Sequence, residues 1–322
     1  MNTALHLKSL IKTFGETVAV RDMDLVVPAG ALYGVIGPNG AGKTTCIRMI
    51  MSILFPDSGE LTVLGRPSAL EAKDRIGYLP EERGVYRKMR VEAFLVYIGR
   101  LKGLTADEAA RRGKALLERV GLPGVERKRC EDLSKGMLQR VQIAAAIIHR
   151  PDLLILDEPF SGLDPVSVRL LREVVLDEHR RGATILFSTH VMSHAEEICQ
   201  HVVMIHRGRK VLDEPMSRLR RRFDPRIVRV EPLDVDDDVP SRLALPAVER
   251  ITRKAAGYEV LLREGADSAA FMRAAVERLP VARLELSRLT LEDIFVRVVS
   301  DGEAEDAALR ASLHVDDEGV TA

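Results

Sequence analysis

Apolar residues in the first part of the chain occur in short alternating or continuous runs, separated by turn residues. This pattern predicts strands over residues 4–10, 17–21, 24–27 and 31–36, with Pro28-Ala29-Gly30 as the turn before the last of them. Apolar side chains at helical spacing predict a helix over residues 43–53, and residues 75–79 have the composition of another strand.

The middle of the chain has a different pattern. Apolar residues recur at helical spacing across residues 91–150, most clearly over 91–101 and 115–120. Residues 153–156, 184–188 and 202–206 are short apolar runs, which are typical of parallel strands covered on both faces. A predicted helix over 165–181 separates the first two runs. The alternation predicts an α/β fold.

A charged stretch, residues 218–224, interrupts this alternation. Predicted strands over 227–230, 258–262 and 282–286 and a helix over 268–277 then indicate a small α+β domain. We therefore expect a first domain over residues 1–222, whose helical part spans about 91–150, and an accessory domain over 225–300. Residues 301–322 are rich in Ala, Glu and Asp, and we expect a disordered tail there.

Charge and composition narrow the class of protein. The 48 basic residues equal the 48 acidic ones, so net charge gives no reason to expect a nucleic-acid partner. The three cysteines are scattered, which argues against a disulfide framework and suits a reducing compartment. No apolar run approaches the ~20 residues of a membrane helix, and no apolar signal segment opens the chain. We expect a cytoplasmic protein whose membrane-spanning partner, if it has one, is another chain.

A glycine-rich loop carries the strongest chemical signal. The run Gly37-Pro38-Asn39-Gly40-Ala41-Gly42-Lys43-Thr44 matches G-x-x-x-x-G-K-[ST] between a predicted strand and a predicted helix, with Thr45 next in the chain. The backbone N–H groups of such a loop surround phosphates, and Lys43 is expected to reach the β- and γ-phosphates of a nucleotide. Thr44 is expected to offer its hydroxyl to Mg²⁺. The competing interpretation is a plain glycine-rich turn.

Two acids end the apolar strand over 153–156. A parallel strand would deliver Asp157 and Glu158 to the carboxyl edge of the sheet, beside the phosphate loop. Asp157 would then support Mg²⁺, and Glu158 would act on the attacking water as a general base or as an orienting group. The alternative is that both acids cap the turn that Pro159 begins.

Further motifs resemble those of one family. Leu133-Ser134-Lys135-Gly136-Met137, before a predicted helix, resembles the signature motif of ATP-binding cassette (ABC) proteins. Residues 161–164, Ser-Gly-Leu-Asp, match the D-loop of that family, and His190 matches its switch histidine. The resemblance covers roughly residues 4–220 and implies a P-loop NTPase fold with a helical subdomain.

The resemblance also implies ATP and Mg²⁺ as cofactors and a head-to-tail homodimer with ATP at the interface. Lys43 and Glu158 of one copy would face Ser134 and Gly136 of the other, and Asp164 of the D-loop would also belong to the nucleotide site. Phe14 occupies the position of an aromatic residue that stacks on adenine; ordinary core packing is the alternative. His190 would contact the γ-phosphate; a surface histidine at a strand end is the alternative.

Two departures from the family pattern stand out. Glu81 occupies the position of the usual Q-loop glutamine, where it keeps an oxygen for Mg²⁺ or water but loses the amide donor. Lys135 replaces a glycine, and either adds positive charge near the neighbour's nucleotide or faces solvent.

Residues 77–84, Gly-Tyr-Leu-Pro-Glu-Glu-Arg-Gly, resemble a subgroup of ABC-2-type export ATPases that includes sodium-efflux subunits. Residues 289–295 resemble the closing helix of that subgroup's accessory domain.

The function expected is therefore that of an ATP-hydrolysing transporter subunit, which drives export through a separate polytopic membrane permease and binds no nucleic acid. A soluble ABC ATPase of DNA repair or translation is the alternative, although such proteins usually carry two cassettes or a long coiled-coil insertion. A GTPase is excluded, because its guanine-reading Asn-Lys-x-Asp motif needs an asparagine and only Asn2 and Asn39 are present.

Overall fold

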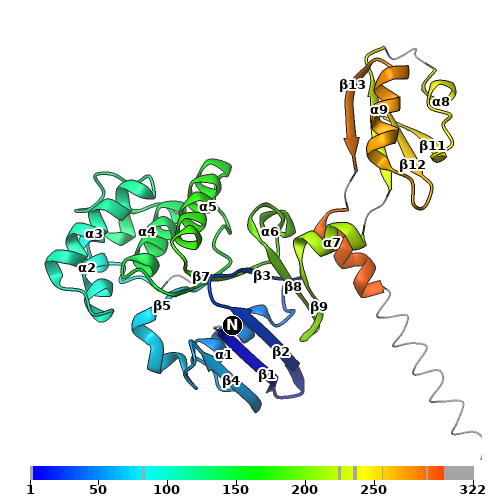
Figure 1. Cartoon of the computed structure of the whole chain (residues 1–322). Coiled ribbons are helices and arrows are strands. Elements are labelled where there is room, and N and C mark those ends of the chain that lie inside the picture. Colours follow the sequence, from blue (N-terminus) through cyan, green and yellow to red (C-terminus); the bar gives the residue numbers. More distant parts are fainter. Residues whose placement is uncertain are drawn as a thin grey trace, which may run out of the picture. The chain divides into compact units, whose positions relative to one another are not determined.

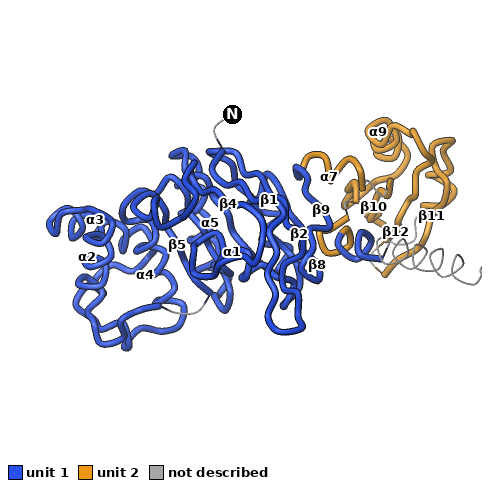
Figure 2. Tube along the Cα trace, turned by 90° about the horizontal axis from the view of Figure 1, so that it is seen from below, with its two compact units in different colours: residues 1–216, 295–322 blue, residues 217–294 orange. Residues whose placement is uncertain are grey.

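The computed structural model describes residues 3–81, 84–223, 226–234, 238–255, 257–287 and 289–300. The chain forms two compact units, residues 1–216 with 295–322, and residues 217–294 (Figure 2). The expected disordered tail, residues 301–322, lies outside the described residues. The domain limits expected from the sequence, 1–222 and 225–300, differ from the limits of these compact units, and we propose them as the domain boundaries.

The larger unit is built on a six-stranded sheet (Figure 1). Its strand order is β5 (Ile76–Leu79), β6 (Leu153–Asp157), β7 (Thr184–Thr189), β3 (Leu32–Ile36), β8 (His201–His206) and β9 (Arg209–Pro215). The first five strands are parallel and β9 runs antiparallel to β8. All residues of β3, β6 and β7 are buried, as the continuous apolar runs predicted. The expected α/β fold is confirmed.

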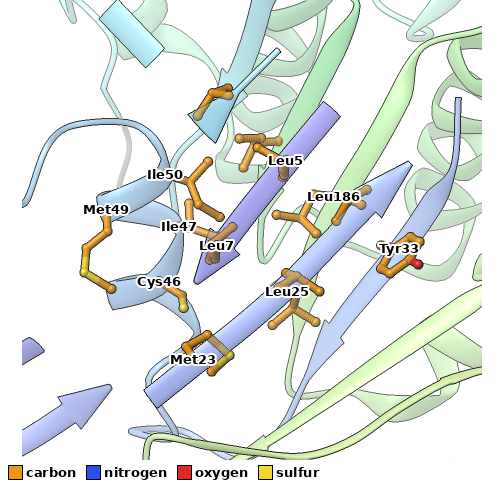
Figure 3. Close-up of a cluster of buried hydrophobic side chains, with 14 of the residues drawn as sticks. Leu5, Leu7, Met23, Leu25, Tyr33, Cys46, Ile47, Met49, Ile50 and Leu186 are labelled. Carbon is orange, nitrogen blue, oxygen red and sulfur yellow. The ribbon is translucent and has the colours of Figure 1, made fainter. Parts of the chain in front are cut away.

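A three-stranded antiparallel sheet, β2 (Thr17–Pro28), β1 (Thr3–Phe14) and β4 (Ser58–Val63), packs with helix α1 (Lys43–Ile50) around one core. Figure 3 shows Leu5, Leu7 and Leu25 of this sheet beside Ile47 and Ile50 of α1. Each such fully buried side chain contributes about 1.5–3 kcal/mol of transfer free energy.

The separate strands expected over 17–21 and 24–27 form one strand, β2. The chain continues through Asp22, whose φ of 47° is left-handed, because β1 pairs along the whole of β2 with several register shifts. Met23 and Leu25 of the second half are buried in the same core.

Helices cover the large sheet. The helical part contains α2 (Val91–Leu101), α3 (Ala106–Arg119) and α4 (Lys135–Ile147), and α5 (Pro165–Arg180) and α6 (Met192–Ile198) flank β7; short 3-10 helices span Ala69–Arg75 and Cys130–Asp132. Local sequence sets the starts of these helices. Thr105 caps α3 by accepting the N–H of Glu108, and Pro165 opens α5 at a position that needs no amide proton.

The smaller unit contains a four-stranded antiparallel sheet in the order β11 (Val248–Lys254), β12 (Gly257–Leu262), β10 (Ile227–Pro232) and β13 (Val281–Leu286). Helices α8 (Val239–Arg242) and α9 (Ser268–Arg278) belong to it, and its core gathers Val228, Val260, Phe271 and Leu279. The predicted break at 218–224 is instead largely helical: α7 spans Met216–Arg222, since arginine is a good helix former. A last helix covers residues 291–300. Across the described residues, no helix combines the length and the hydropathy that crossing a bilayer requires.

Candidate functional site

The phosphate loop lies at the carboxyl end of β3 and enters α1 through backbone that only glycine adopts easily. Gly37, Gly40 and Gly42 have φ of 154°, 76° and 106°. A Cβ on Gly37 would lie 2.2 Å from the carbonyl oxygen of Ile205, and one on Gly42 would lie 2.5 Å from that of Ala19. The loop backbone therefore packs closely against the main chain of β8 and β2, which leaves no room for a side chain at Gly37 or Gly42.

Lys43 folds back over this loop. Its Nζ donates to the carbonyl oxygens of Gly37 at 2.8 Å and Pro38 at 3.1 Å, and lies 3.9 Å from Oε1 of Glu158. Burial lowers the pKa of Lys43, while the nearby carboxylates of Glu158 and Asp157 raise it. The Lys43 ammonium is buried and held by main-chain carbonyls and a nearby carboxylate, so phosphate oxygens bound in the loop could replace those carbonyls as its acceptors.

Only one of the two carboxylate oxygens of Asp157, the last residue of β6, accepts hydrogen bonds from the described residues. Its Oδ1 accepts hydrogen bonds from Thr44 Oγ1 at 3.3 Å and from the hydroxyl of Ser188. Its Oδ2 is buried and has no hydrogen-bond partner among the described residues. Burial raises the pKa of Asp157, while the bonds from Ser188 and Thr44 lower it. A buried carboxylate oxygen beside a threonine hydroxyl is the oxygen set that Mg²⁺ prefers.

Glu158 follows in a left-handed conformation, with φ of 50°. Its side chain, 6% exposed, turns toward the end of β7. Oε1 accepts the main-chain N–H of His190 at 2.9 Å and its Nδ1 at 2.8 Å, and Oε2 accepts the hydroxyl of Thr189 at 3.2 Å. The carboxylates of Asp157 and Glu158 therefore do not cap the following turn, and His190 is more than a solvated surface side chain.

Ser188, Thr189 and Gln139 belong to the same constellation, and none of these three residues was predicted from the sequence to be part of the site. Ser188 Oγ also accepts the N–H of Glu158 at 3.3 Å, and Gln139 Nε2 donates to the carbonyl oxygen of Pro159 at 2.5 Å. The available signal was the position of Ser188 and Thr189 at the end of the strand over 184–189. Because β7 is the neighbour of β6, its last residues meet the two acids.

The expected nucleotide-site residues of the signature segment and the D-loop, Ser134, Gly136 and Asp164, lie apart from this constellation. Ser134 is exposed and caps α4, its Oγ accepting the N–H of Met137 at 3.3 Å. Gly136 packs close to Leu163, since a Cβ there would lie 3.2 Å from Leu163 Cδ2. Asp164 caps α5 by accepting the N–H groups of Val166 and Ser167, both at 3.0 Å. Among the described residues, none of these three hydrogen-bonds to Lys43 or Glu158.

A cavity of about 450 Å³ opens beside Glu158 and is lined by Leu79, Pro80, Glu81, Lys135, Gln139, Gln142, Glu158 and Ser161. Lys135 is exposed, yet its chain lies along the D-loop, because a Cβ on Gly162 would lie 3.2 Å from Lys135 Nζ. The Lys135 ammonium therefore lies beside Gly162 and lines the cavity, so it does not simply extend into solvent. Glu81 is exposed at the same cavity, and its carboxylate raises the pKa of both Lys43 and Asp157. Residues 82–83 of the Q-loop run lie outside the described residues.

Phe14 ends β1 with 47% of its surface exposed, so it is not a core residue. The ammonium of Lys12 lies 5.6 Å from the centre of its ring. An exposed aromatic ring at a strand end is open to stacking on one face.

Comparisons with known proteins agree with these motifs. Residues 20–161 match the family model "ABC transporter", and residues 215–299 match "ATP-binding protein DrrA1-3-like, C-terminal domain". The ABC transporter ATP-binding protein YhaQ of Bacillus subtilis is 38% identical over 92% of this chain and 98% of its own length. The Nod factor export ATP-binding protein I of Cupriavidus pinatubonensis is 39% identical over 66% of each chain. A solved ATP-binding subunit of an ABC transporter superposes with a TM-score of 0.64 at 32% identity, covering 69% of this chain and 93% of that one.

These matches favour a transporter subunit over a non-transport ABC ATPase, and they account for both parts of the chain. The family resemblance carried by the phosphate loop, the signature segment and the switch histidine is confirmed. The chain belongs to the ATP-binding subunits of ABC transporters, which bind and hydrolyse ATP.

Proposed function

We propose that this chain is the motor subunit of an exporter and works as a head-to-tail pair. Each ATP would be bound by the phosphate loop, Asp157, Glu158 and His190 of one copy and by Ser134 and Gly136 of the other. Closure on ATP would drive a separate membrane permease, and hydrolysis would reopen the pair. Export as the direction is supported by the name of the related Nod factor protein.

The exposed start of helix α4 supports a nucleotide site that two copies of the chain share. The N-terminus of α4, a helix of 13 residues, carries the exposed Ser134, whose Oγ accepts the N–H of Met137, while the N–H groups of Lys135 and Gly136 have no acceptor within the helix. Such a helix start is an anion site. Because Ser134 makes no hydrogen bond to its own copy's Lys43 or Glu158 among the described residues, a second copy is the simplest donor of a nucleotide for it.

Mg²⁺ would be held by Thr44 and Asp157, with Glu81 as a further oxygen ligand from across the cavity. The unpartnered Oδ2 of Asp157 beside the Thr44 hydroxyl supports this assignment. The ion would supply positive charge to the terminal phosphates, while Lys43 adds a second cation.

Glu158 would accept a proton from, or orient, the attacking water, and His190 would fix the carboxylate while presenting Nε2 toward the γ-phosphate. The observation that carries the proposal is the buried Glu158 carboxylate, held between Lys43 at 3.9 Å and His190 at 2.8 Å. A carboxylate oriented by fixed donors beside a phosphate-binding cation is what water activation requires.

Mixing two inactive variants tests the composite site. Glu158→Gln disables the hydrolytic half and Ser134→Arg disables the opposing half, so each homodimer has two broken sites. A mixed pair regains one intact site, and an equimolar mixture is expected to recover about a quarter of wild-type turnover, because half of randomly formed pairs are mixed. Turnover that stays at the level of the separate variants would contradict the head-to-tail arrangement. The matched control is a mixture of Glu158→Gln with Lys43→Ala, because both changes disable the same half of the site and a mixed pair then regains no intact site.

Co-purification from native membranes tests the transport partner. We expect a polytopic chain to accompany the ATPase and to change its turnover on reconstitution. Recovery with ribosomes or DNA that stimulate turnover, in place of a membrane chain, would overturn this part of the proposal.

A further inference from the structure

Asp57, which directly precedes β4, ties that strand to the end of β1 through three separate bonds. Its Oδ1 accepts Lys12 Nζ at 2.7 Å, its Oδ2 accepts the N–H of Thr13 at 2.7 Å, and its own N–H donates to the carbonyl oxygen of Ile11 at 2.8 Å. The hydrogen bonds from Lys12 and Thr13 hold the pKa of Asp57 below its ordinary value, so the group stays ionised at neutral pH.

Lys12 links this carboxylate to Phe14. Only 17% of the Lys12 side chain is exposed, and its ammonium lies 5.6 Å from the centre of the Phe14 ring. Phe14 itself is 47% exposed and is absent from the buried core. Packing therefore does little to orient the ring, and the clamped backbone of Thr13 together with the Lys12 ammonium does more.

The same strand end adjoins the phosphate loop. Phe14 pairs with Thr17 across the β1–β2 turn, and two residues further on the carbonyl oxygen of Ala19 occupies the space where a Cβ of Gly42 would be. The turn after β8 closes the contact, because Gly208 N donates to Ala41 O at 2.9 Å and Arg21 N donates to Gly208 O at 2.8 Å. A ring at position 14 is thus set at a fixed place beside the loop that binds phosphates.

We propose that Asp57 is a positioning residue for the nucleobase: it fixes the Thr13 backbone and the Lys12 ammonium, which together hold the Phe14 ring ready to stack on adenine. This inference rests on the proposed role of Phe14 in ATP binding. Asp57 does not touch the nucleotide. It lowers the cost of ordering an exposed ring when the base arrives.

A double-mutant cycle separates this role from that of a simple strand clamp. The affinity of the full-length protein for the fluorescent nucleotide mant-ATP is measured for wild type, Asp57→Asn, Phe14→Ala and the double variant, with kcat and KM for ATP alongside. Glu60→Gln is the matched control, because it removes a nearby carboxylate, in β4, that also meets a β1 lysine, Lys8, at 4.0 Å but is 79% exposed.

We expect Phe14→Ala to weaken binding at least about fivefold, the scale of one base–aromatic stack. Asp57→Asn should weaken it about two- to fivefold through the loosened cation and ring. It should raise KM and leave kcat nearly unchanged. In the Phe14→Ala background Asp57→Asn should have no further effect, and Glu60→Gln should behave as wild type.

The outcomes distinguish the two proposals. No loss from Phe14→Ala would overturn the adenine role of that ring. A loss from Phe14→Ala with none from Asp57→Asn, or an equal Asp57→Asn effect with and without the ring, would overturn the positioning role alone. If Asp57→Asn does not fold, Lys12→Met takes its place in the cycle, and Lys12→Arg, which keeps the cation, should restore affinity.

Discussion

Two nitrogen atoms of His190, the main-chain N and Nδ1, meet the same oxygen of Glu158, at 2.9 and 2.8 Å. Because a carboxylate only accepts, Nδ1 carries a proton in this contact, and Nε2 is the ring nitrogen left for another ligand. Oε2 receives Thr189, so the carboxylate is held from both sides. Glu158 and His190 therefore form one hydrogen-bonded unit, and the predictions below test the catalytic role that we propose for it.

Replacing Glu158 by glutamine is expected to preserve nucleotide binding and to slow ATP turnover by at least about a hundredfold, or roughly 2.7 kcal/mol of barrier. The amide keeps the size of the side chain and an acceptor for His190 but cannot take a proton. Turnover and mant-ATP affinity of the same preparation check this. Turnover within tenfold of wild type would remove Glu158 from the chemical step.

His190 variants separate orientation of Glu158 from contact with phosphate. His190→Ala loses the side-chain bond to Oε1 and is expected to lower kcat about 10- to 100-fold with little change in nucleotide affinity. His190→Asn keeps a short N–H donor toward Oε1 but has no counterpart of Nε2. Partial recovery in His190→Asn would assign part of the loss to orientation, whereas equal loss in both variants would assign it to Nε2.

The half-bound carboxylate of Asp157 predicts an altered metal requirement. Asp157→Asn keeps an oxygen for Thr44 and Ser188 but puts an amide where the unpartnered Oδ2 now lies. We expect the free Mg²⁺ concentration for half-maximal ATP turnover to rise about tenfold or more. Nucleotide affinity measured in EDTA serves as the control and should be unchanged. An unaltered Mg²⁺ dependence would contradict the assignment of the metal to this residue.

Asp213 on β9 predicts a pH-dependent contribution to stability. Burial raises its pKa, but hydrogen bonds from His201 and Lys210, both at 2.7 Å, outweigh that effect and hold the pKa below its ordinary value of 3.8. A depressed carboxyl pKa stabilises the fold fully above 3.8, and the stabilisation is lost as the pH falls through the lower native value.

Asp213→Asn is accordingly expected to lower the free energy of unfolding by about 1–2 kcal/mol at neutral pH. The difference from wild type should shrink as the pH falls below 3.8, because the unfolded wild-type chain then binds a proton at Asp213 that the native state does not yet bind. Urea unfolding at several pH values measures it. A difference that grows toward low pH would have the wrong sign for this explanation.

The close packing around Gly77 in β5 predicts that any larger residue there destabilises the protein. A Cβ there would lie 2.2 Å from the carbonyl oxygen of Ala146 in α4, and that backbone cannot move without shifting the helix. Gly77→Ala is expected to destabilise the protein by about 1–3 kcal/mol and to disturb Glu81, which follows β5. Gly84→Ala is the matched control, since no atom of the described part of the chain lies within 4 Å of its Cβ position, and it should change stability by less than about 0.5 kcal/mol.

Sequence alone identified the phosphate loop, the two acids and most strands and longer helices, because these depend on local spacing and on side-chain type. It did not predict β4, β9 or β11, whose residues become strands by pairing with β1, β8 and β12. The motifs also pointed to the family before any contact was known. Apolar periodicity left β2 divided in two, since the strand runs through left-handed Asp22 only when its partner β1 is present along its whole length.

Only the tertiary structure decided which groups meet. Ser188 and Thr189 have no motif of their own, and they reach Asp157 and Glu158 because β7 lies beside β6 in the sheet. The exposure of Phe14 and its link to Asp57 likewise depend on the tertiary structure. Thr13 and Asp57, which form the hydrogen bond beside this ring, are 44 residues apart in the sequence. Local patterns specify residue types and elements, whereas hydrogen bonds between distant strands set the distances on which the chemistry depends.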